Sequence, residues 1–192
     1  MKAVLLSVRP TYCEKIASGK KTIEVRKSRP KQETPFKVYI YQTKKPVSVM
    51  ISGTGKHISE YDKTYCYNEK SGKVIGEFIC DKIDSYVGRD DNKDYWDLSV
   101  DEWEELKKKS CLTIPQILEY TGDCCRCYGW HISELKIYDK PKRLSEFYAK
   151  CNIPESKCKL CDNCYDRADY YGRHYAVKKL ERPPQSWCYV ED

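Results

Sequence analysis

The sequence lacks any long hydrophobic run. Among its 192 residues, no stretch approaches the roughly 18 consecutive apolar residues that a membrane-spanning helix needs. The N-terminal segment, MKAVLLSVR, is apolar for only a few residues before Arg9. This is too short for the core of a signal peptide and instead predicts a buried first strand. We therefore expect a cytoplasmic protein without a membrane segment.

The sequence also lacks an internal repeat and a complete catalytic set. With 192 residues, of which 40% are hydrophobic, the chain is long enough to bury one core and too short for several large domains. The expected organisation is one domain over residues 1–192, interrupted by a Cys-rich insertion at about residues 150–165.

Positive and negative charges are unevenly distributed along the chain, whose net charge is +6. Residues 1–50 contain twelve Lys or Arg and three Glu, a net of +9, whereas residues 90–105 contain eight Asp or Glu and one Lys, a net of −7. Such asymmetry is typical of a protein that presents one face to a polyanion and another to solvent or a partner. The alternative is an ordinary lysine-rich surface.

The hydrophobic periodicity predicts short strands interspersed with a few helices. Capping-box patterns at Ser99 and Thr113, and a Pro10 start with a Gly19 stop, mark the helix ends. The expected strands cover residues 4–8, 22–26, 36–42, 47–52, 73–86, 128–138 and 187–190, and the helices cover 12–18, 99–108 and 113–122, with a helical turn at 144–149. This pattern favours an α+β fold, a small mixed β-barrel with helices over its openings.

Twelve cysteines are the most unusual feature of the composition. In a reducing compartment, clustered cysteines more often bind metal than form disulfides. Four of them fall within fourteen residues and include two overlapping C-x-x-C spacings, which suit one tetrahedral ion. We expect structural zinc bound by Cys151, Cys158, Cys161 and Cys164.

Other interpretations of the cysteines stay open. The spacing is similar to that of iron–sulfur proteins, although no proline follows the last cysteine. Free thiols on a loop are a further alternative. One of Cys124, Cys125 or Cys127 completes the zinc site if Cys151 does not. Most of the remaining cysteines are interpreted as small buried hydrophobic residues.

One acidic residue, Glu24, lies among several cations in the segment GKKTIEVRKSRP at residues 19–30. Alternation predicts a half-buried strand, with positions 23 and 25 toward the core and Thr22, Glu24 and Arg26 on the opposite face. We expect the Glu24 carboxylate to be semi-buried, ionised and within ion-pair reach of Arg26 or Lys21. The alternative is a solvated surface pair that contributes little to stability.

The same segment resembles the mark of the ASCH family, whose members share a PUA-like barrel. The pattern Gly-x-Lys-x-x-Glu-x-Arg is matched in full from Gly19 to Arg26, and SVRP at residues 7–10 fits the same opening. Three later patches, GKVIGEFICDKI, YGWHISELKIYDKPKRLSEF and RPPQSWCYVE, are similar to later parts of such proteins, the last to prophage-type members in particular. The resemblance implies a barrel of the PUA-like type.

The resemblance also implies a role in RNA metabolism, with a binding site in the cleft between the first helix and the barrel. We expect this cleft to bind RNA, or a modified nucleoside in nucleic acid. Lys21, Glu24 and Arg26 map to it residue by residue. The expected ligand-binding residues are Ser7, Lys21, Thr22, Glu24, Arg26 and Trp187.

Two other functions stay open. Some relatives hydrolyse N(4)-acetylcytidine and others are ribonucleases, which would make Lys21 and Glu24 catalytic residues of a hydrolase. However, Glu24 stands where the amidohydrolases have a threonine nucleophile. The second alternative is a phage-type interaction protein whose acidic segment, residues 90–105, binds a host protein.

Two tryptophans lie on predicted late strands. Trp187 follows a stiff Pro-Pro pair and either stacks on a base, which contributes about 1–3 kcal/mol where it occurs, or packs into the core. Trp130 is interpreted as a core residue. His131 beside it is a weaker acid–base candidate, because a structural histidine is more common.

Overall fold

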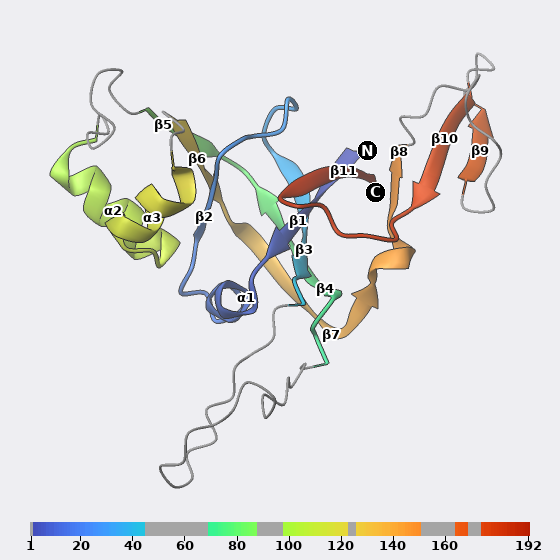
Figure 1. The fold of residues 1–192 in the computed structure, drawn as a ribbon, viewed down its shortest axis with the longest axis horizontal. Helices are drawn as coiled ribbons and strands as arrows, with labels where there is room; N and C mark the ends of the chain where they lie inside the picture. Colours follow the sequence, from blue (N-terminus) through green and yellow to red (C-terminus); the bar gives the residue numbers. More distant parts are fainter. Residues whose placement is uncertain (1, 45–68, 88–97, 123–125, 151–163, 169–173) are drawn as a thin grey trace, which may run out of the picture.

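The computed structural model describes residues 2–44, 69–87, 98–122, 126–150, 164–168 and 174–192 (Figure 1). No helix in these ranges is long and apolar enough to cross a membrane. The elements are β1 Lys2–Val8, α1 Pro10–Ala17, β2 Ile23–Arg26, β3 Phe36–Gln42, β4 Lys73–Cys80, β5 Ile83–Val87, α2 Val100–Ser110, α3 Ile114–Thr121, β6 Arg126–His131, β7 Ser133–Arg143, the 3-10 helix η2 Leu144–Glu146, β8 Tyr148–Lys150, β9 Cys164–Ala168, β10 His174–Lys179 and β11 Trp187–Glu191.

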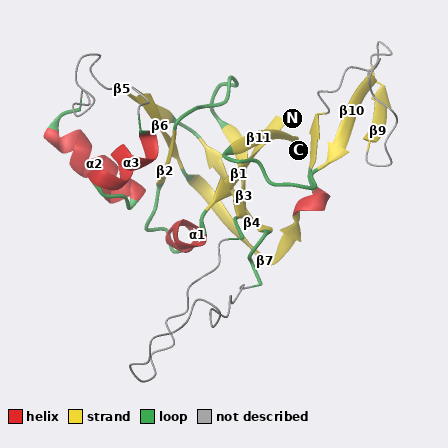
Figure 2. Cartoon of the chain, viewed as in Figure 1, coloured by secondary structure: helices red, strands yellow, loops and turns green. Residues whose placement is uncertain are grey.

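The strands form three sheets, which confirms the predicted mixed α+β class (Figure 2). The largest has the order β11-β1-β3-β4-β7, in which β1 and β3 are parallel and the other neighbours are antiparallel. A second, antiparallel sheet has the order β2-β6-β5, and a third has the order β8-β10-β9. Both ends of the described chain lie together, because β11 pairs with β1.

Two long extended segments pass from the first sheet to the second. The strand predicted at 73–86 is divided at Asp81 and Lys82 into β4 and β5, and the strand predicted at 128–138 is divided at Ile132 into β6 and β7. The two segments stay side by side at the crossing, where the His131 N–H donates to the Lys82 carbonyl at 3.0 Å. The second sheet therefore continues the first.

The predicted closed barrel is wrong for the strands that the structure describes. Closure would need a backbone ladder between β2 and the β1–β11 pair, but β2 is an edge strand bonded only to β6. With only four residues, β2 approaches β1 and β11 through side chains instead. We call this gap between β2 and the β1–β11 pair the seam, and the candidate site lies in it.

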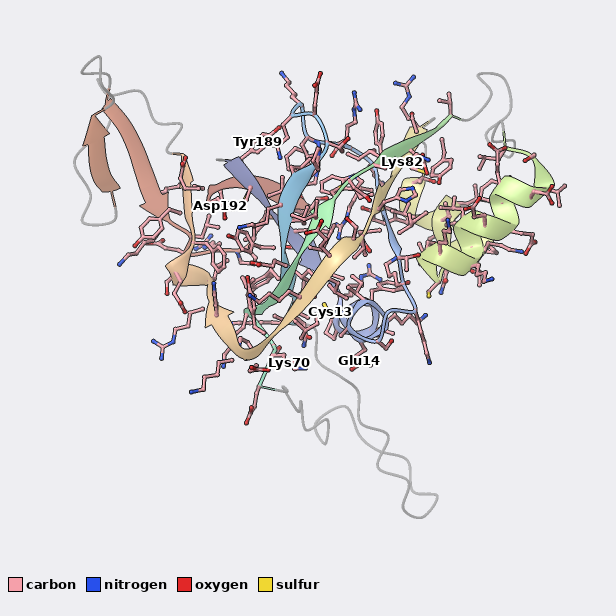
Figure 3. The ribbon with its side chains drawn as sticks, turned by 180° about the vertical axis from the view of Figure 1, so that it is seen from behind. Cys13, Glu14, Lys70, Lys82, Tyr189 and Asp192 are labelled. Carbon is pink, nitrogen blue, oxygen red and sulfur yellow. The ribbon has the colours of Figure 1, made fainter. Side chains whose placement is uncertain are left out.

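Three hydrophobic clusters hold the sheets and helices together. One face of the largest sheet packs against α1, with Cys13 turned inward at the junction (Figure 3), and against Trp130 of β6. The other face packs against η2 and the loop that leads to β11. The third cluster lies between α2, α3 and the β2–β6 pair. As a result, β2 is covered on both of its faces.

The helix ends follow their sequence signals. Ser99 and Thr113 each close a capping box, with Glu102 and Gln116 respectively, as predicted. Helix α1 begins at Pro10, and Gly19, at φ 71°, follows its last turn. These ends matter for the site because they fix where α1 leads into β2.

Some predicted features lie outside the described residues. These are the strand at 47–52 and the cysteines Cys151, Cys158 and Cys161. Cys164 begins β9. Strands β8, β9 and β10 were not predicted. The helical turn predicted at 144–149 is correct only for Leu144–Glu146, because Tyr148 already begins β8.

Candidate functional site

Strand β2 carries the two charged residues at the centre of the site. All four of its residues are buried, so the predicted half-buried strand is wrong. Ile23 and Val25 pack into the cluster under α2 and α3, as the alternation requires. Glu24 and Arg26 face the seam, which α1 and the largest sheet cover. Because both faces of β2 are buried, its residues do not alternate between buried and exposed positions.

Glu24 is held between two cations inside the protein. Arg26 Nη2 lies 2.7 Å from Glu24 Oε1, and Lys21 Nζ lies 3.2 Å from Glu24 Oε2. The exposed fractions are 6% for Glu24, 6% for Arg26 and 2% for Lys21. The predicted ion pairing is confirmed, and the burial is deeper than predicted. We call these three residues the ionic cluster.

The cations decide the ionisation of Glu24. Burial by itself would raise the pKa of this carboxyl group, but the charges of Lys21 and Arg26 and their hydrogen bonds together hold the pKa below its ordinary value. Glu24 is therefore a carboxylate at neutral pH. It can therefore serve as a fixed hydrogen-bond acceptor, and it is not suited to give or take a proton at neutral pH.

Lys21 joins the cluster to the end of helix α2. Its ammonium group donates to the Ser110 carbonyl at 2.7 Å and lies 5.2 Å from the centre of the Tyr12 ring. Nearby, Lys15 Nζ donates to the Cys111 carbonyl at 3.3 Å. The last carbonyls of a helix have no partners within the helix and favour positive charge. Lys21 thus balances a carboxylate and a helix C-terminus together.

Arg26 spans the seam. Its Nη2 donates to the Ser7 carbonyl of β1 at 2.7 Å, and Nη1 donates to Ser186 Oγ, just before β11, at 3.4 Å. Ser7 in turn donates through Oγ to the Pro184 carbonyl at 2.7 Å and through its N–H to the Ser186 carbonyl at 2.9 Å. A guanidinium with several directed donors suits this bridge between strands that share no ladder.

Four buried polar atoms around the cluster have no hydrogen-bond partner among the described residues: Glu24 Oε2, Arg26 Nε, Ser110 Oγ and Trp130 Nε1. Glu24 Oε2 is nonetheless in ion-pair contact with Lys21 Nζ, at 3.2 Å. Glu24 and Trp130 are register partners across the β2–β6 pair. An unsatisfied buried polar atom costs about 1–3 kcal/mol. Such atoms provide hydrogen-bonding capacity for a further group.

The other predicted ligand-binding residues are placed differently. Ser7 joins the cluster, through its carbonyl group. Thr22 is exposed and precedes β2, and its backbone bonds Lys109 and Ile132. Trp187 is half-buried, with its ring 5.9 Å from that of Trp130 and its Nε1 donating to Ser28 Oγ at 3.0 Å. Its ring therefore lies at the edge of the core.

Trp130 is fully buried, which confirms its interpretation as a core residue. Sequence reasoning missed Tyr12 and Ser110 as neighbours of the cluster. The apolar face of α1 was a usable signal for Tyr12. Ser110 takes part through a backbone carbonyl 89 positions away, and no side-chain pattern signals such a contact.

The cleft that was predicted around Glu24 is closed in this structure. Two cavities of about 290 and 360 Å³ are lined by other residues of the described chain, and neither includes a member of the ionic cluster. Helix α1 covers the cluster through Tyr12, whose ring lies beside Lys21. Burial raises the pKa of the Tyr12 hydroxyl, and the charge of Glu24 raises this pKa to a smaller extent. Access to Glu24 therefore requires Tyr12 or the loop at Ser186 to move.

Three of the described cysteines behave as hydrophobic residues. Cys13 and Cys80 are fully buried, as predicted, and burial raises the pKa of both thiols. Cys127 packs into the cluster under α2 and α3, where burial raises its pKa to about 12. Within the described ranges, no group of three or more His, Cys, Asp or Glu side chains is arranged to hold a metal ion.

The acidic segment is partly neutralised from within. Residues 90–97 lie outside the described chain, and the rest belongs to the start of α2. There Glu102 closes the capping box, while Glu104 and Glu105 pair with Lys107 and Lys109. These pairs compensate two of the four carboxylates on the described part of this segment.

Three crystal structures of ASCH from Zymomonas mobilis are similar to this chain. The protein itself matches with a TM-score of 0.54 and 15% identity over 99% of this chain and 88% of that one. A tyrosine-to-phenylalanine variant matches at 0.54 and 14% over 100% and 92%, and a serine-to-alanine variant at 0.54 and 15% over 99% and 89%. No protein-family model matches the sequence, and no curated protein matches it. At this level of identity the likeness concerns the fold, and this chain has the fold of an ASCH domain.

Proposed function

We propose that this protein binds RNA, or a modified nucleoside within RNA, at the ionic cluster. The observation that carries the proposal is a set of buried polar atoms with hydrogen-bonding capacity left: an acceptor on Glu24 Oε2, which is ion-paired with Lys21, and donors on Arg26 and Trp130. Sequence-specific RNA recognition uses unstacked bases, whose edges place donors and acceptors next to one another. The resemblance to PUA-like proteins supports the same ligand class.

Exposed cations lie in the chain segments next to the cluster residues. They come from the end of β1, the loop after α1 and the loop after β2, and they are Arg9, Lys20, Lys27, Arg29 and Lys31. Phosphate groups bind such side chains with little regard to sequence. The surface would therefore hold the RNA backbone, while the cluster reads a single base that is turned inward beside Tyr12.

The geometry gives less support to a hydrolase. A carboxylate whose pKa is lowered is a poor general base at neutral pH, and Glu24 is such a group. Lys21 is occupied by Glu24, the Ser110 carbonyl and the Tyr12 ring. Lys21 therefore acts by orienting Glu24, whose carboxylate accepts from the ligand. Binding without turnover is therefore the function that we propose.

Binding of short, fluorescently labelled single-stranded RNA of mixed sequence tests the proposal. We expect affinity to fall steeply with salt, because neutralised phosphates release counterions. Replacing Lys20, Lys27 and Lys31 by Gln should weaken all sequences alike. It should also reduce the salt slope by about 0.7 for each phosphate that the variant no longer neutralises.

A matched control removes three exposed lysines elsewhere, Lys136, Lys140 and Lys178. This variant has the same net charge as the first and should bind RNA like the parent protein. If both triple variants bound RNA equally weakly, the effect would come from net charge and not from the position of the lysines. Failure to bind any RNA would contradict the proposal, and preference for DNA would correct its ligand class.

We also propose that Cys151, Cys158, Cys161 and Cys164 bind one structural zinc ion. Their spacing supports this, since paired thiolates two residues apart suit tetrahedral zinc. The purified protein should contain about one equivalent of zinc, and Cys161→Ser should release it. The matched control is Cys188→Ser, outside the four, which should retain the metal. Metal-free protein with four titratable thiols, or a brown protein with visible absorbance, would contradict the assignment.

A further inference from the structure

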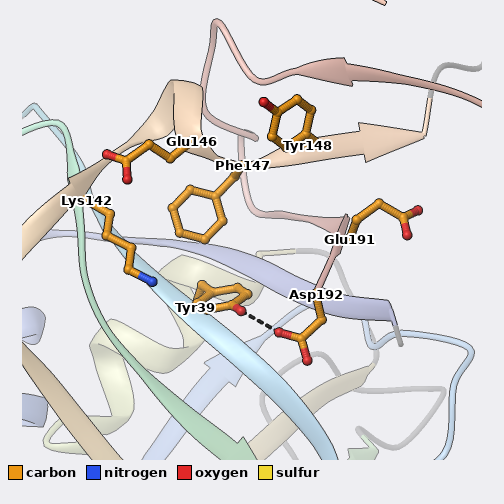
Figure 4. Close-up of a pocket in the computed structure, with 7 residues that line it drawn as sticks. All are labelled: Tyr39, Lys142, Glu146, Phe147, Tyr148, Glu191 and Asp192. Carbon is orange, nitrogen blue, oxygen red and sulfur yellow. Dashed lines mark hydrogen bonds between the residues drawn. The ribbon is translucent and has the colours of Figure 1, made fainter. Parts of the chain in front are cut away.

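A second candidate site lies on the face of the largest sheet that is turned away from α1 and the ionic cluster. A cavity of about 290 Å³ opens there, beside the last residues of β11 (Figure 4). Tyr39 and Phe147 in its wall belong to the hydrophobic cluster of that face. The lining combines three aromatic rings, those of Tyr39, Phe147 and Tyr148, with three carboxylates, those of Glu146, Glu191 and Asp192.

The aromatic wall is held in a defined geometry. The rings of Tyr39 and Phe147 meet edge to face, with centroids 4.8 Å apart and an interplanar angle of 66°. The Tyr39 hydroxyl donates to Asp192 Oδ1 at 2.5 Å, and Lys37 Nζ lies 2.8 Å from the same oxygen. Neither of these contacts uses Asp192 Oδ2.

The charge of the lining is opposite to that of the whole chain. Three carboxylates and one ammonium, that of Lys142, give the lining residues a net of −2, of which Lys37 beside Asp192 compensates one, in a chain of net +6. Lys142 Nζ lies 4.7 Å from the centre of the neighbouring Tyr138 ring. Burial would raise the pKa of Asp192, but hydrogen bonds from Lys37 and Tyr39 hold the pKa below its ordinary value. This carboxylate is therefore charged at neutral pH.

We propose that this cavity binds an organic cation, specifically the guanidinium group of arginine. Aromatic faces attract cations through their quadrupole, and planar guanidinium groups also stack on rings. Carboxylates at the edge would receive the N–H donors, as in Arg–carboxylate pairs. Lysine ammonium groups already lie over the Tyr39 and Tyr138 rings, at 5.8 and 4.7 Å, which shows the same preference within the chain. A compact metal ion would gain nothing from the aromatic wall.

Titration with N-acetyl-arginine amide, followed by two-dimensional amide NMR, tests the site. We expect saturable shifts at Tyr148, Glu191 and Asp192. N-acetyl-citrulline amide has nearly the same shape but no charge, and it should therefore bind at least about tenfold more weakly. A tenfold change in affinity corresponds to about 1.4 kcal/mol. A short peptide with one central arginine distinguishes the source: much tighter binding of the peptide assigns a polypeptide ligand, and equal binding assigns a free one.

Variants locate the effect. The double change Glu191→Gln and Asp192→Asn should weaken arginine binding about tenfold, and Phe147→Leu should weaken it severalfold. Glu14→Gln, at an exposed position of α1, is the control and should bind like the parent protein. Equal affinity for citrulline, shifts at residues outside the cavity, or no shift at all in the parent protein would each overturn the proposal. The NMR result on the parent protein stands even if a variant does not fold.

Discussion

Glu24 and Asp84 both lie on strands of the second sheet, and each has two basic side chains beside it. Glu24 is sealed between Lys21 and Arg26, with its side chain 8% exposed. Asp84 pairs with Lys82 Nζ at 2.8 Å and His131 Nε2 at 2.6 Å, but its side chain is 27% exposed and that of Lys82 is 64% exposed. The two sites have similar distances and different surroundings.

Burial determines how much each of these ion pairs contributes to stability and how rigidly it holds its members. Water and salt can replace the partners of Asp84, so this pair contributes little to stability. No solvent is available to replace those of Glu24, so each of its charges depends on the other two. A buried, mutually dependent set of charges fixes the positions of its members. This rigidity is what a binding site for a base edge requires.

The largest expected effect separates the two carboxylates directly. Glu24→Gln leaves two buried cations without a counter-charge and should lower the free energy of unfolding by about 3–5 kcal/mol. The matched change Asp84→Asn should cost about 1 kcal/mol or less. Urea denaturation of both variants measures the difference. Equal costs would show that the Glu24 environment is as wet as that of Asp84.

Acid should act on the same cluster through protonation. The pKa of Glu24 is lower in the folded protein than its ordinary value of 4.5, so the unfolded state binds more protons in this pH range. The free energy of unfolding therefore falls as the pH drops below 4.5 and passes through the folded pKa. Glu24→Gln should make the unfolding free energy less steeply dependent on pH in this window. The measurement is urea denaturation at a series of pH values below 5. An unchanged slope in the variant would show that Glu24 does not titrate there differently from the unfolded chain.

Added salt should produce the smallest effect of the three, and it should change the stability cost of the substitution at Asp84 but not that at Glu24. Added sodium chloride screens exposed charges more than buried ones. The cost of Asp84→Asn should shrink by up to about 0.5 kcal/mol at high salt, while that of Glu24→Gln should stay the same. Repeating the urea series at low and high salt gives both numbers. A Glu24 cost that falls with salt in parallel would argue against a sealed cluster.

Much of the local structure was predictable from the sequence. The caps at Ser99 and Thr113 and the turn at Gly19 depend only on neighbouring residues, and the structure has all three. The pairing of Glu24 with Arg26 was predictable for a similar reason, because residues two apart on a strand share a face.

The surroundings of the cluster were not predictable in this way. Helices α2 and α3 cover the second face of β2, and their packing depends on residues about eighty positions later in the chain. The same is true of the Ser110 carbonyl, a backbone group that carries no side-chain signal. The open seam follows from which strands find backbone partners across the whole chain. Alternation in one strand does not contain that information.

The most direct test of the proposed function is to follow the Trp130 indole N–H by NMR while RNA is added. This atom is buried, has no hydrogen-bond partner among the described residues and lies on the register partner of Glu24. If a base enters the ionic cluster, the Trp130 indole signal should shift as the RNA binds, whereas that of Trp103 on α2 should not. RNA binding that leaves the Trp130 signal unchanged would contradict recognition at the cluster.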